Sequence, residues 1–406
     1  MPDRIVITGL GAVTPMGLGA VRFWEGLAAG ENAVRRLEGL PPDFPVSVAG
    51  TVPDFAPEAL FDRRTARRTG RFGLFGLLAA REAMAQSGLD PASDPDRIGV
   101  VVGTSGGTLW PHGQETVLRE SGPRRVDPLL LSKQGPYMAA VRIGMDLGVH
   151  GPTSTVDSAC ASGLDAIGHA LLLLRGGHAD AILAGGVESP VSDLGLAVLS
   201  QVGALTRSTD PETACRPFDR ERNGFVLGEG AGILVLERES YARARGATIL
   251  AEVAGIGWSF DASDETAPDV RGQSLAMIHA LEDADTTPKD LDWVKAHGTS
   301  TVLNDRTETA ALRLALGDAL AEQVPVSSIK SMIGHTASAS GGVEGVAAVL
   351  AMSHGIIPPT IHYAHPDPAC DLDYVPNQAR PKRLRQVLLN AFGLGGQNAS
   401  LVLRSV

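Results

Sequence analysis

Short apolar runs recur along the chain and predict buried strands that alternate with helices. Ile5-Val6-Ile7 opens the series, and residues 100–102, 181–184 and 233–236 continue it. Uninterrupted apolar runs of this length are typical of strands covered on both faces. Small-residue stretches such as 163–170, typical of closely packed helices, lie between the runs. The pattern therefore predicts an α/β fold.

Three short signatures occur twice in the same order, which indicates an internal duplication. The signatures and their copies are residues 9–11 and 255–257, 100–105 and 294–300, and 225–228 and 392–395. Chance matches would not preserve this order. We therefore predict two duplicated α/β halves, residues 1–245 and 246–406, that meet in the basic, small-residue stretch 243–246.

Cys160 and His335 hold equivalent positions in the two predicted halves. Each follows an apolar run and precedes a helix, at residues 163–170 in one half and 342–350 in the other. Ligand sites in α/β folds gather at such strand-to-helix turns. If the two halves pack face to face, both turns contribute to one site.

The composition argues against several classes of function. A formal net charge of −11 and an aromatic content of 4% disfavour nucleic-acid binding. The three cysteines, Cys160, Cys215 and Cys370, form neither a disulfide framework nor a CxxC metal knuckle. No apolar run approaches a membrane span, and the first residues do not form a signal peptide. We expect a cytoplasmic protein that binds neither nucleic acid nor membrane.

Cys160 stands where a β-prone segment gives way to a predicted helix start. Unpaired N–H groups and the positive end of the helix dipole lower the pKa of a thiol placed there. They also offer hydrogen bonds to a developing oxyanion. From the local sequence alone, Cys160 could equally well be a small, buried, apolar side chain with a purely structural role.

His297 and His335 lie at glycine-flanked turns, whereas the other eight histidines lie in helices or loops without such context. One thiol and two imidazoles suit carbon–carbon bond formation between thioesters. The thiol accepts an acyl group, and neutral imidazoles donate hydrogen bonds to a second thioester carbonyl as an enolate forms. Lys330 is close enough in sequence to order this site. The His and Cys spacings match no zinc site, so we expect no metal.

Three motifs, at residues 157–163, 296–301 and 330–335, contain these side chains. Together they resemble the β-ketoacyl-ACP synthases of the decarboxylating Cys-His-His type, and the resemblance runs the full length of the chain. That family includes fatty-acid elongation enzymes and catalytic subunits of type II polyketide systems. The resemblance implies the thiolase fold, with two α/β halves in a five-layered αβαβα arrangement. It also implies decarboxylative Claisen condensation of a Cys-bound acyl group with malonyl-ACP.

The resemblance assigns a role to individual residues. Cys160 becomes the acylated nucleophile, His297 and His335 polarise the malonyl thioester, and Lys330 and Glu344 support the histidines. The backbone N–H groups of Cys160 and Leu394 form the oxyanion hole. The residues expected to contact the pantetheine arm or the substrate are Thr299, Thr301, Phe392 and Leu394. No cofactor is implied, because substrates arrive on the phosphopantetheine of an acyl carrier protein.

Three residues depart from the family pattern. Leu394 stands where a second Phe usually gates the acyl pocket, and Gln397 stands where Thr is common in fatty-acid enzymes. Lys295 replaces the usual Asn, which leaves open whether the monovalent cation reported in parts of the family binds here. We interpret the three departures as signs of a specialised enzyme, and polyketide synthesis is the favoured pathway.

Basic residues stand out in this acidic chain and are candidates for docking an acidic carrier protein. Arg63, Arg67 and Arg71 recur every fourth residue and would share a helix face. The full docking set is Arg63, Arg64, Arg67, Arg68, Arg124, Arg125 and Arg207. A solvated or ion-paired face is the alternative. In the family, the segment 132–138 crosses to a partner subunit, so we expect a homodimer or a heterodimer with a chain-length factor. The loop 104–110 is expected to line the pocket.

Other classes of protein fit less well. A non-catalytic chain-length subunit lacks the nucleophilic Cys, and an initiating synthase carries Asn in place of His335. A degradative thiolase needs a second reactive Cys late in the chain, but Cys370 lies in an acidic segment that synthases share. A cysteine hydrolase needs a His oriented by Asn or Asp, and no such signature is present.

Overall fold

A large mixed sheet runs through the computed structural model, which describes residues 3–41, 43–106 and 113–406. From one edge to the other its strands are β11 (Val326–Ser327), β10 (Trp293–Lys295), β14 (Gln386–Phe392), β15 (Gln397–Arg404), β9 (Ala251–Phe260), β1 (Ile5–Thr14), β8 (Gly230–Arg238), β7 (Ala181–Glu188), β5 (Ile98–Gly103) and β6 (Thr153–Val156). The short β2 (Gly17–Leu18) pairs with β1.

The two halves of the sheet repeat one strand order outward from the central pair β1 and β9. One half runs β1-β8-β7-β5-β6, and the other runs β9-β15-β14-β10-β11. The directions match as well, since the two inner pairings in each half are antiparallel and the outer ones are parallel. The duplicated sequence signatures fall on corresponding strands and turns. The boundary between residues 245 and 246 follows α11 (Glu239–Ala244) and stays a prediction.

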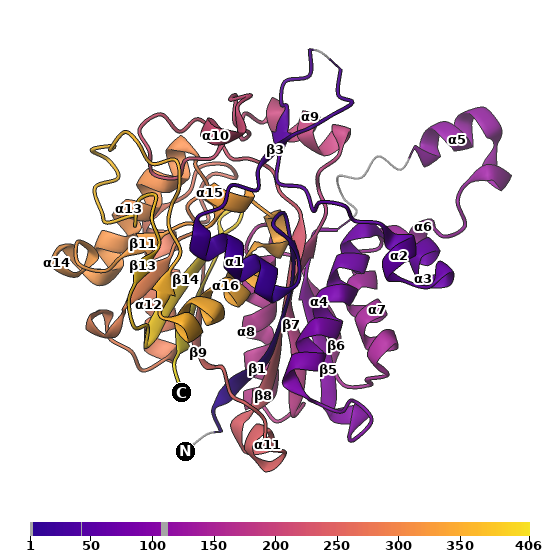
Figure 1. Ribbon diagram of the computed structural model, residues 1–406, viewed down its shortest axis with the longest axis horizontal. Coiled ribbons are helices and arrows are strands. Elements are labelled where there is room, and N and C mark those ends of the chain that lie inside the picture. The colour runs from indigo at the N-terminus through magenta and orange to yellow at the C-terminus, as the bar shows by residue number, and fades with distance from the viewer. Residues whose placement is uncertain (1–2, 42, 107–112) are drawn as a thin grey trace.

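Helices cover both faces of each half and complete five layers, as expected (Figure 1). The central layer is the pair α8 (Ser162–Arg175) and α16 (Ser340–His354), which contacts both halves of the sheet. Two outer pairs cover the remaining faces: α4 (Arg71–Ser87) with α7 (Met138–Leu147), and α12 (Val270–Asp283) with α13 (Val302–Leu316). The αβαβα arrangement follows from these contacts.

The remaining elements are short and lie around the layers. The strands are β3 (Arg35–Arg36), β4 (Val48–Ala49), β12 (Ile356–Ile357) and β13 (Arg380–Pro381). The helices are α1 (Ala20–Ala29), α2 (Pro57–Leu60), α3 (Arg63–Arg68), α5 (Gln114–Ser121), α6 (Leu130–Gln134), α9 (Asp193–Gln201), α10 (Pro211–Ala214), α14 (Asp318–Ala321) and α15 (Lys330–Ile333). Helix α5 projects from the body (Figure 1). No described helix is long and apolar enough to cross a membrane.

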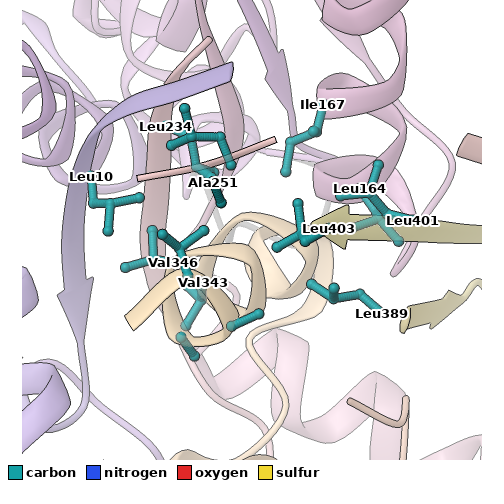
Figure 2. Close-up of a cluster of buried hydrophobic side chains, with 14 of the residues drawn as sticks. Leu10, Leu164, Ile167, Leu234, Ala251, Val343, Val346, Leu389, Leu401 and Leu403 are labelled. Carbon is teal, nitrogen blue, oxygen red and sulfur yellow. The ribbon is translucent and has the colours of Figure 1, made fainter. Parts of the chain in front are cut away.

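The core is built where α8 and α16 meet the sheet. Figure 2 shows Leu164 and Ile167 of α8 and Val343 and Val346 of α16 among buried side chains from both halves. Fully burying a side chain of this size contributes about 1.5–3 kcal/mol. The strands and the central helices are therefore held mainly by apolar packing.

Glycines let α16 approach both α8 and the sheet very closely. A Cβ atom on Gly342 would lie 2.2 Å from the Gly232 oxygen and 2.3 Å from the Gly186 nitrogen. A Cβ on Gly341 would lie 2.1 Å from the Leu164 nitrogen. Both positions are helical, so the requirement is for space and not for an unusual backbone angle.

We predict that Gly342→Ala lowers the free energy of unfolding by about 2 kcal/mol or more, because the methyl group forces α16 away from the sheet. Gly345→Ala in the same helix is the matched control. Its Cβ would lie 3.4 Å from Ile167 Cδ1, an ordinary contact, so stability should stay equal or rise by about 0.5–1 kcal/mol. Urea denaturation measures both. Equal loss in the two variants would contradict the packing argument.

Candidate active site

Cys160 lies at a sharp turn between β6 and α8. The preceding residue, Ala159, has a φ of +52°, a left-handed conformation that costs a non-glycine residue about 1 kcal/mol. The Ser162 hydroxyl donates to the Ala159 carbonyl at 2.6 Å and accepts from the Ser158 N–H at 2.9 Å. The Asp157 carboxylate accepts the Ala159 N–H at 3.1 Å. These bonds hold the strained turn that presents the thiol.

The backbone N–H groups of Cys160 and Leu394 lie near the Cys160 sulfur and act to lower the pKa of its thiol. Leu394 belongs to the turn between β14 and β15, where the Gly393 N–H donates to the Gln397 carbonyl at 2.7 Å. Two glycines with positive φ, Gly395 at 94° and Gly396 at 82°, complete this turn. The structure thus brings together the two donors that the sequence proposed for an oxyanion hole.

The expected lowering of the Cys160 pKa is wrong. Burial of the thiol raises its pKa above the ordinary value, because a thiolate loses its water shell there. The positive charge of Lys330 and the two backbone N–H groups oppose this rise without overcoming it. The resting nucleophile is therefore a thiol.

His297 and His335 face each other beside the cysteine. Their ring centroids are 5.3 Å apart and the rings are nearly perpendicular, at 88°. Phe392 packs against His297 and Phe225 against His335, with centroid distances of 5.6 and 5.2 Å. Both histidines are only 3% exposed. This enclosure by aromatic rings keeps the imidazoles in a dry environment.

Hydrogen bonds at the Nδ1 atoms indicate which nitrogen of each histidine carries the proton. Lys330 Nζ lies 3.5 Å from His297 Nδ1 and donates to the His297 carbonyl at 2.7 Å. His335 Nδ1 lies 2.9 Å from the Ser340 hydroxyl. Since an ammonium only donates, we assign the proton of His297 to Nε2. The Ser340 hydroxyl can donate to His335 in the same way.

Burial holds the pKa of both histidines well below the ordinary value, and the charge of Lys330 lowers each pKa further. The imidazoles are therefore neutral over the physiological range. A neutral imidazole with its proton on Nε2 can donate one hydrogen bond to a carbonyl oxygen without giving up a proton. This is the state that enolate formation needs.

Glu308, on α13, was not found by sequence reasoning. Its carboxylate accepts the N–H groups of His297 and Gly298 at 2.7 and 2.8 Å, and the Asn390 side chain at 3.1 Å. Burial raises the pKa of Glu308, and these donors oppose the rise. Glu308 fixes the backbone on which His297 stands. Ser340 was missed in the same way, because each contact forms only when the turn after the histidine brings the following helix back onto it.

Lys330 and Glu344 lie behind His297 and do not border the cavity. Lys330 Nζ is 2.5 Å from Glu344 Oε1, and both side chains are buried. Lys295 Nζ is also 2.5 Å from that oxygen. Lys330, which the sequence proposed as a support for the histidine pair, thus shares a buried counter-ion with Lys295.

One cavity of about 360 Å³ joins the predicted residues. The predicted site residues that border it are Cys160, His297, Thr299, Thr301, His335, Phe392 and Leu394. Thr301 caps α13, and its hydroxyl lies 2.9 Å from that of Thr299. Leu394 is 55% exposed, and Val202, Val302 and Leu303 add apolar surface where the cavity meets solvent. A long, partly apolar substrate arm fits this lining.

The other two cysteines do not border the cavity. Burial raises the pKa of Cys215 and that of Cys370 to about 12. Among the described residues, one group could offer three metal ligands: Asp219, Glu221 and His365. Both Asp219 oxygens already accept backbone N–H groups, so this carboxylate clamps a loop.

The arginines proposed for docking fall into three places. Arg63, Arg64, Arg67 and Arg68 are exposed on or beside α3 and border a shallow hollow with Pro128 and Leu129. Arg124 and Arg125 are exposed next to α5, and the Arg207 N–H donates to Asn223, which borders the cavity. Part of the loop expected to line the pocket, residues 107–110, lies outside the described residues.

Arg71 does not share the basic face that the four-residue spacing predicted. The helix breaks after Arg68, and Arg71 starts α4. Its guanidinium pairs with Glu229 at 2.6 and 2.9 Å and lies over the rings of Phe55 and Phe75. Arg71 therefore forms a structural ion pair with Glu229 and is not a docking residue.

Comparison with known proteins gives consistent matches along the chain. The models for the N-terminal and C-terminal domains of beta-ketoacyl synthases match residues 2–242 and 250–364. The chain is 41% identical to 3-oxoacyl-[acyl-carrier-protein] synthase 2 of Staphylococcus aureus (strain COL), and 43% identical to a putative polyketide beta-ketoacyl synthase 1 of Streptomyces halstedii. Each alignment covers 99% of this chain and 98% of the relative.

Solved structures match over the whole length as well. The ishigamide ketosynthase/chain length factor superimposes with a TM-score of 0.92 at 36% identity, and covers 100% of both chains. A beta-ketoacyl synthase from Burkholderia phymatum STM815 gives 0.91 at 36% identity, again over 100% of both chains. A type II polyketide ketosynthase in complex with its acyl-carrier protein gives 0.91 at 33% identity, with the same coverage.

The fold and the matches define an acyl-transferring enzyme of the thiolase superfamily that forms carbon–carbon bonds. This confirms the predicted fold class. The chain belongs to the β-ketoacyl synthase family, as the family models and the relatives at 41–43% identity show.

We predict that iodoacetamide alkylates Cys160 and spares Cys215 and Cys370 in the folded protein. Because burial raises the Cys160 pKa, the rate should still be rising at pH 9. Lys330→Met removes a charge that lowers this pKa, so alkylation at pH 8 should slow by about threefold to tenfold. Peptide mass spectrometry across pH measures this, with Cys160→Ser as control. A rate that is flat above pH 7 would contradict the raised pKa.

Proposed function

We propose that this β-ketoacyl synthase condenses an acyl group held on Cys160 with a malonyl group carried by an acyl carrier protein. The supporting observation is one thiol, under two backbone N–H groups, that shares a cavity with two buried neutral imidazoles. The thiol suits acyl transfer, and the imidazoles suit a developing enolate. The thiol lies in the first half of the chain and both imidazoles lie in the second, so neither half alone carries both functions.

The first step is transfer of the acyl group to the enzyme. The Cys160 sulfur attacks the acyl thioester, and the oxyanion that forms accepts the N–H groups of Cys160 and Leu394. The carbon–sulfur bond to the carrier then breaks, and the carrier thiol leaves with the proton from Cys160. Donors fixed in the backbone need no rearrangement when the charge develops.

The second step is decarboxylation and condensation. The malonyl thioester carbonyl accepts hydrogen bonds from Nε2 of His297 and His335, which stabilises the enolate left when the C–CO₂ bond breaks. The enolate carbon attacks the acyl carbonyl on Cys160. The bond to sulfur breaks, the β-ketoacyl product stays on the carrier, and the thiolate takes up a proton. Carbon dioxide is the other product.

Single substitutions should separate the two steps. We predict that Cys160→Ala abolishes the acyl adduct seen by intact mass spectrometry after incubation with acyl carriers, but leaves release of CO₂ from malonyl carrier measurable. His297→Ala and His335→Ala should keep the adduct and lose about 10²- to 10³-fold in CO₂ release, because each removes a donor to the enolate. An adduct that persists in Cys160→Ala, or undiminished CO₂ release in both histidine variants, would overturn these roles.

We infer that the arginines around α3 dock the carrier protein. Arg63, Arg64, Arg67 and Arg68 stand exposed in an acidic chain. Burial lowers the pKa of nearby Arg142, and the charges of Arg68 and Arg64 lower it further. This concentration of positive charge suits an acidic partner. The solved relative in complex with its carrier protein supports the proposal.

Charge reversal tests the docking surface. The double variant Arg67→Glu/Arg68→Glu should raise KM for an acyl carrier protein by about tenfold and leave kcat with a small acyl-pantetheine thioester unchanged. High salt should remove most of the difference. Arg383→Glu is the control, since Arg383 is exposed but precedes β14 at the strand end opposite Phe392. Equal effects of both substitutions would argue against this surface.

We further propose a dimer, formed with a second copy or with a chain-length factor. Segment 130–147 presents three exposed apolar side chains, Leu131, Tyr137 and Met145, as a partner-covered surface would. The staphylococcal relative favours fatty-acid synthesis as the pathway, whereas the Streptomyces relative and the ishigamide structure favour polyketide synthesis with a chain-length factor. Leu394 in the gate position favours the polyketide alternative.

A further inference from the structure

Lys295 is a buried cation to which the reaction steps above assign no role. It ends β10, two residues before His297, and its side chain is 0% exposed. Its Nζ lies 2.5 Å from Glu344 Oε1, the oxygen that Lys330 also contacts. Apart from this ion pair, the described residues give Lys295 Nζ no hydrogen-bond partner. Its contribution to the site is therefore mainly its charge.

The charged groups that act on Lys295 come from three helices. Lys330 lies on α15, Glu344 on α16 and Glu308 on α13, and all three act on the Lys295 ammonium. Its own charge reaches His297 and His335. Two ammonium groups thus face two carboxylates and two neutral imidazoles. Burying an unpaired charge is costly. The balance of positive and negative charge in this cluster therefore depends on both lysines.

A separate monovalent cation, as reported in parts of the family, does not fit this arrangement. The usual Asn is replaced by Lys295, whose ammonium already contacts Glu344. An added ion at this carboxylate would place a third positive charge beside the two lysines. The residues present therefore exclude the ion by charge repulsion.

We propose that Lys295 is a positioning residue that places a positive charge beside Glu344 from within the chain. Through Glu344 it keeps Lys330 directed at His297, and its charge adds to the burial and the Lys330 charge that keep both histidines neutral. This inference rests on the proposed role of the histidines in decarboxylation.

The charge of Lys295 determines in which direction its removal shifts the pKa of the two histidines. Burial lowers the pKa of Lys295 to about 7, and Glu344 and Glu308 oppose the shift. Below pH 7 the ammonium predominates, and its charge lowers the pKa of His297 and of His335. Without it, the pKa of each histidine rises, while burial and Lys330 still lower it. Protonation of His297 at Nδ1 would then turn two donors, Lys330 and the imidazolium, toward each other.

The first experiment compares pH profiles of CO₂ release from malonyl carrier for the wild type, Lys295→Met and Lys289→Met. The last is the control, because Lys289 is exposed and precedes the same strand. We expect the acid limb of the Lys295→Met profile to lie at higher pH than that of the wild type, and the two profiles to converge above about pH 8. Profiles of the wild type and Lys295→Met that superimpose would overturn the proposal. A uniform loss at every pH would do the same, since it indicates a structural effect only.

The second experiment exchanges the salt. Wild-type activity should stay the same when all sodium and potassium are replaced by tetramethylammonium. Lys295→Ala, which leaves space beside Glu344, should lose activity in tetramethylammonium and regain about tenfold on addition of potassium or ammonium. A wild type that needs potassium would overturn the proposal even if the variants do not fold. A wild type that releases no CO₂ in any salt would instead contradict the proposed decarboxylation.

Discussion

The close contact of α16 with α8 and the sheet is the constraint on which the site depends. Cys160 lies directly before α8, and His335 lies shortly before α16. The spacing of the two helices therefore sets the spacing of nucleophile and imidazole. Glycines at 163, 341 and 342 allow backbone to meet backbone, so no side chain can adjust this distance. A duplicated fold thus gives one site that needs both copies.

Burial of charge is the second condition that shapes the site. Lys295, Lys330, Glu344 and Glu308 are all within the core, where unpaired ions are costly. Because their charges are matched, the cluster can remain dry and still hold two histidines in the neutral state. The same dryness raises the Cys160 pKa, so the environment that favours the enolate leaves the free nucleophile protonated.

Sequence reasoning predicted the parts of this arrangement that depend on local pattern. Cys160 follows a β-prone run at a predicted helix start, His297 and His335 lie at glycine-flanked turns, and the repeat placed them together. Ser340 and Glu308 were missed, because their contacts join elements that no periodicity links. The basic face was wrong at Arg71, where a break in the helix and the buried Glu229 turn the side chain inward. The predicted lowering of the Cys160 pKa was wrong, because the burial that raises this pKa arises only when the cavity is assembled.

Leu394 combines two tasks in one residue. Its backbone N–H faces the Cys160 sulfur, while its side chain lies at the open part of the cavity on a turn with two glycines of positive φ. A substitution at Leu394 therefore alters the lining of the cavity and the turn that carries the donor to Cys160 at the same time.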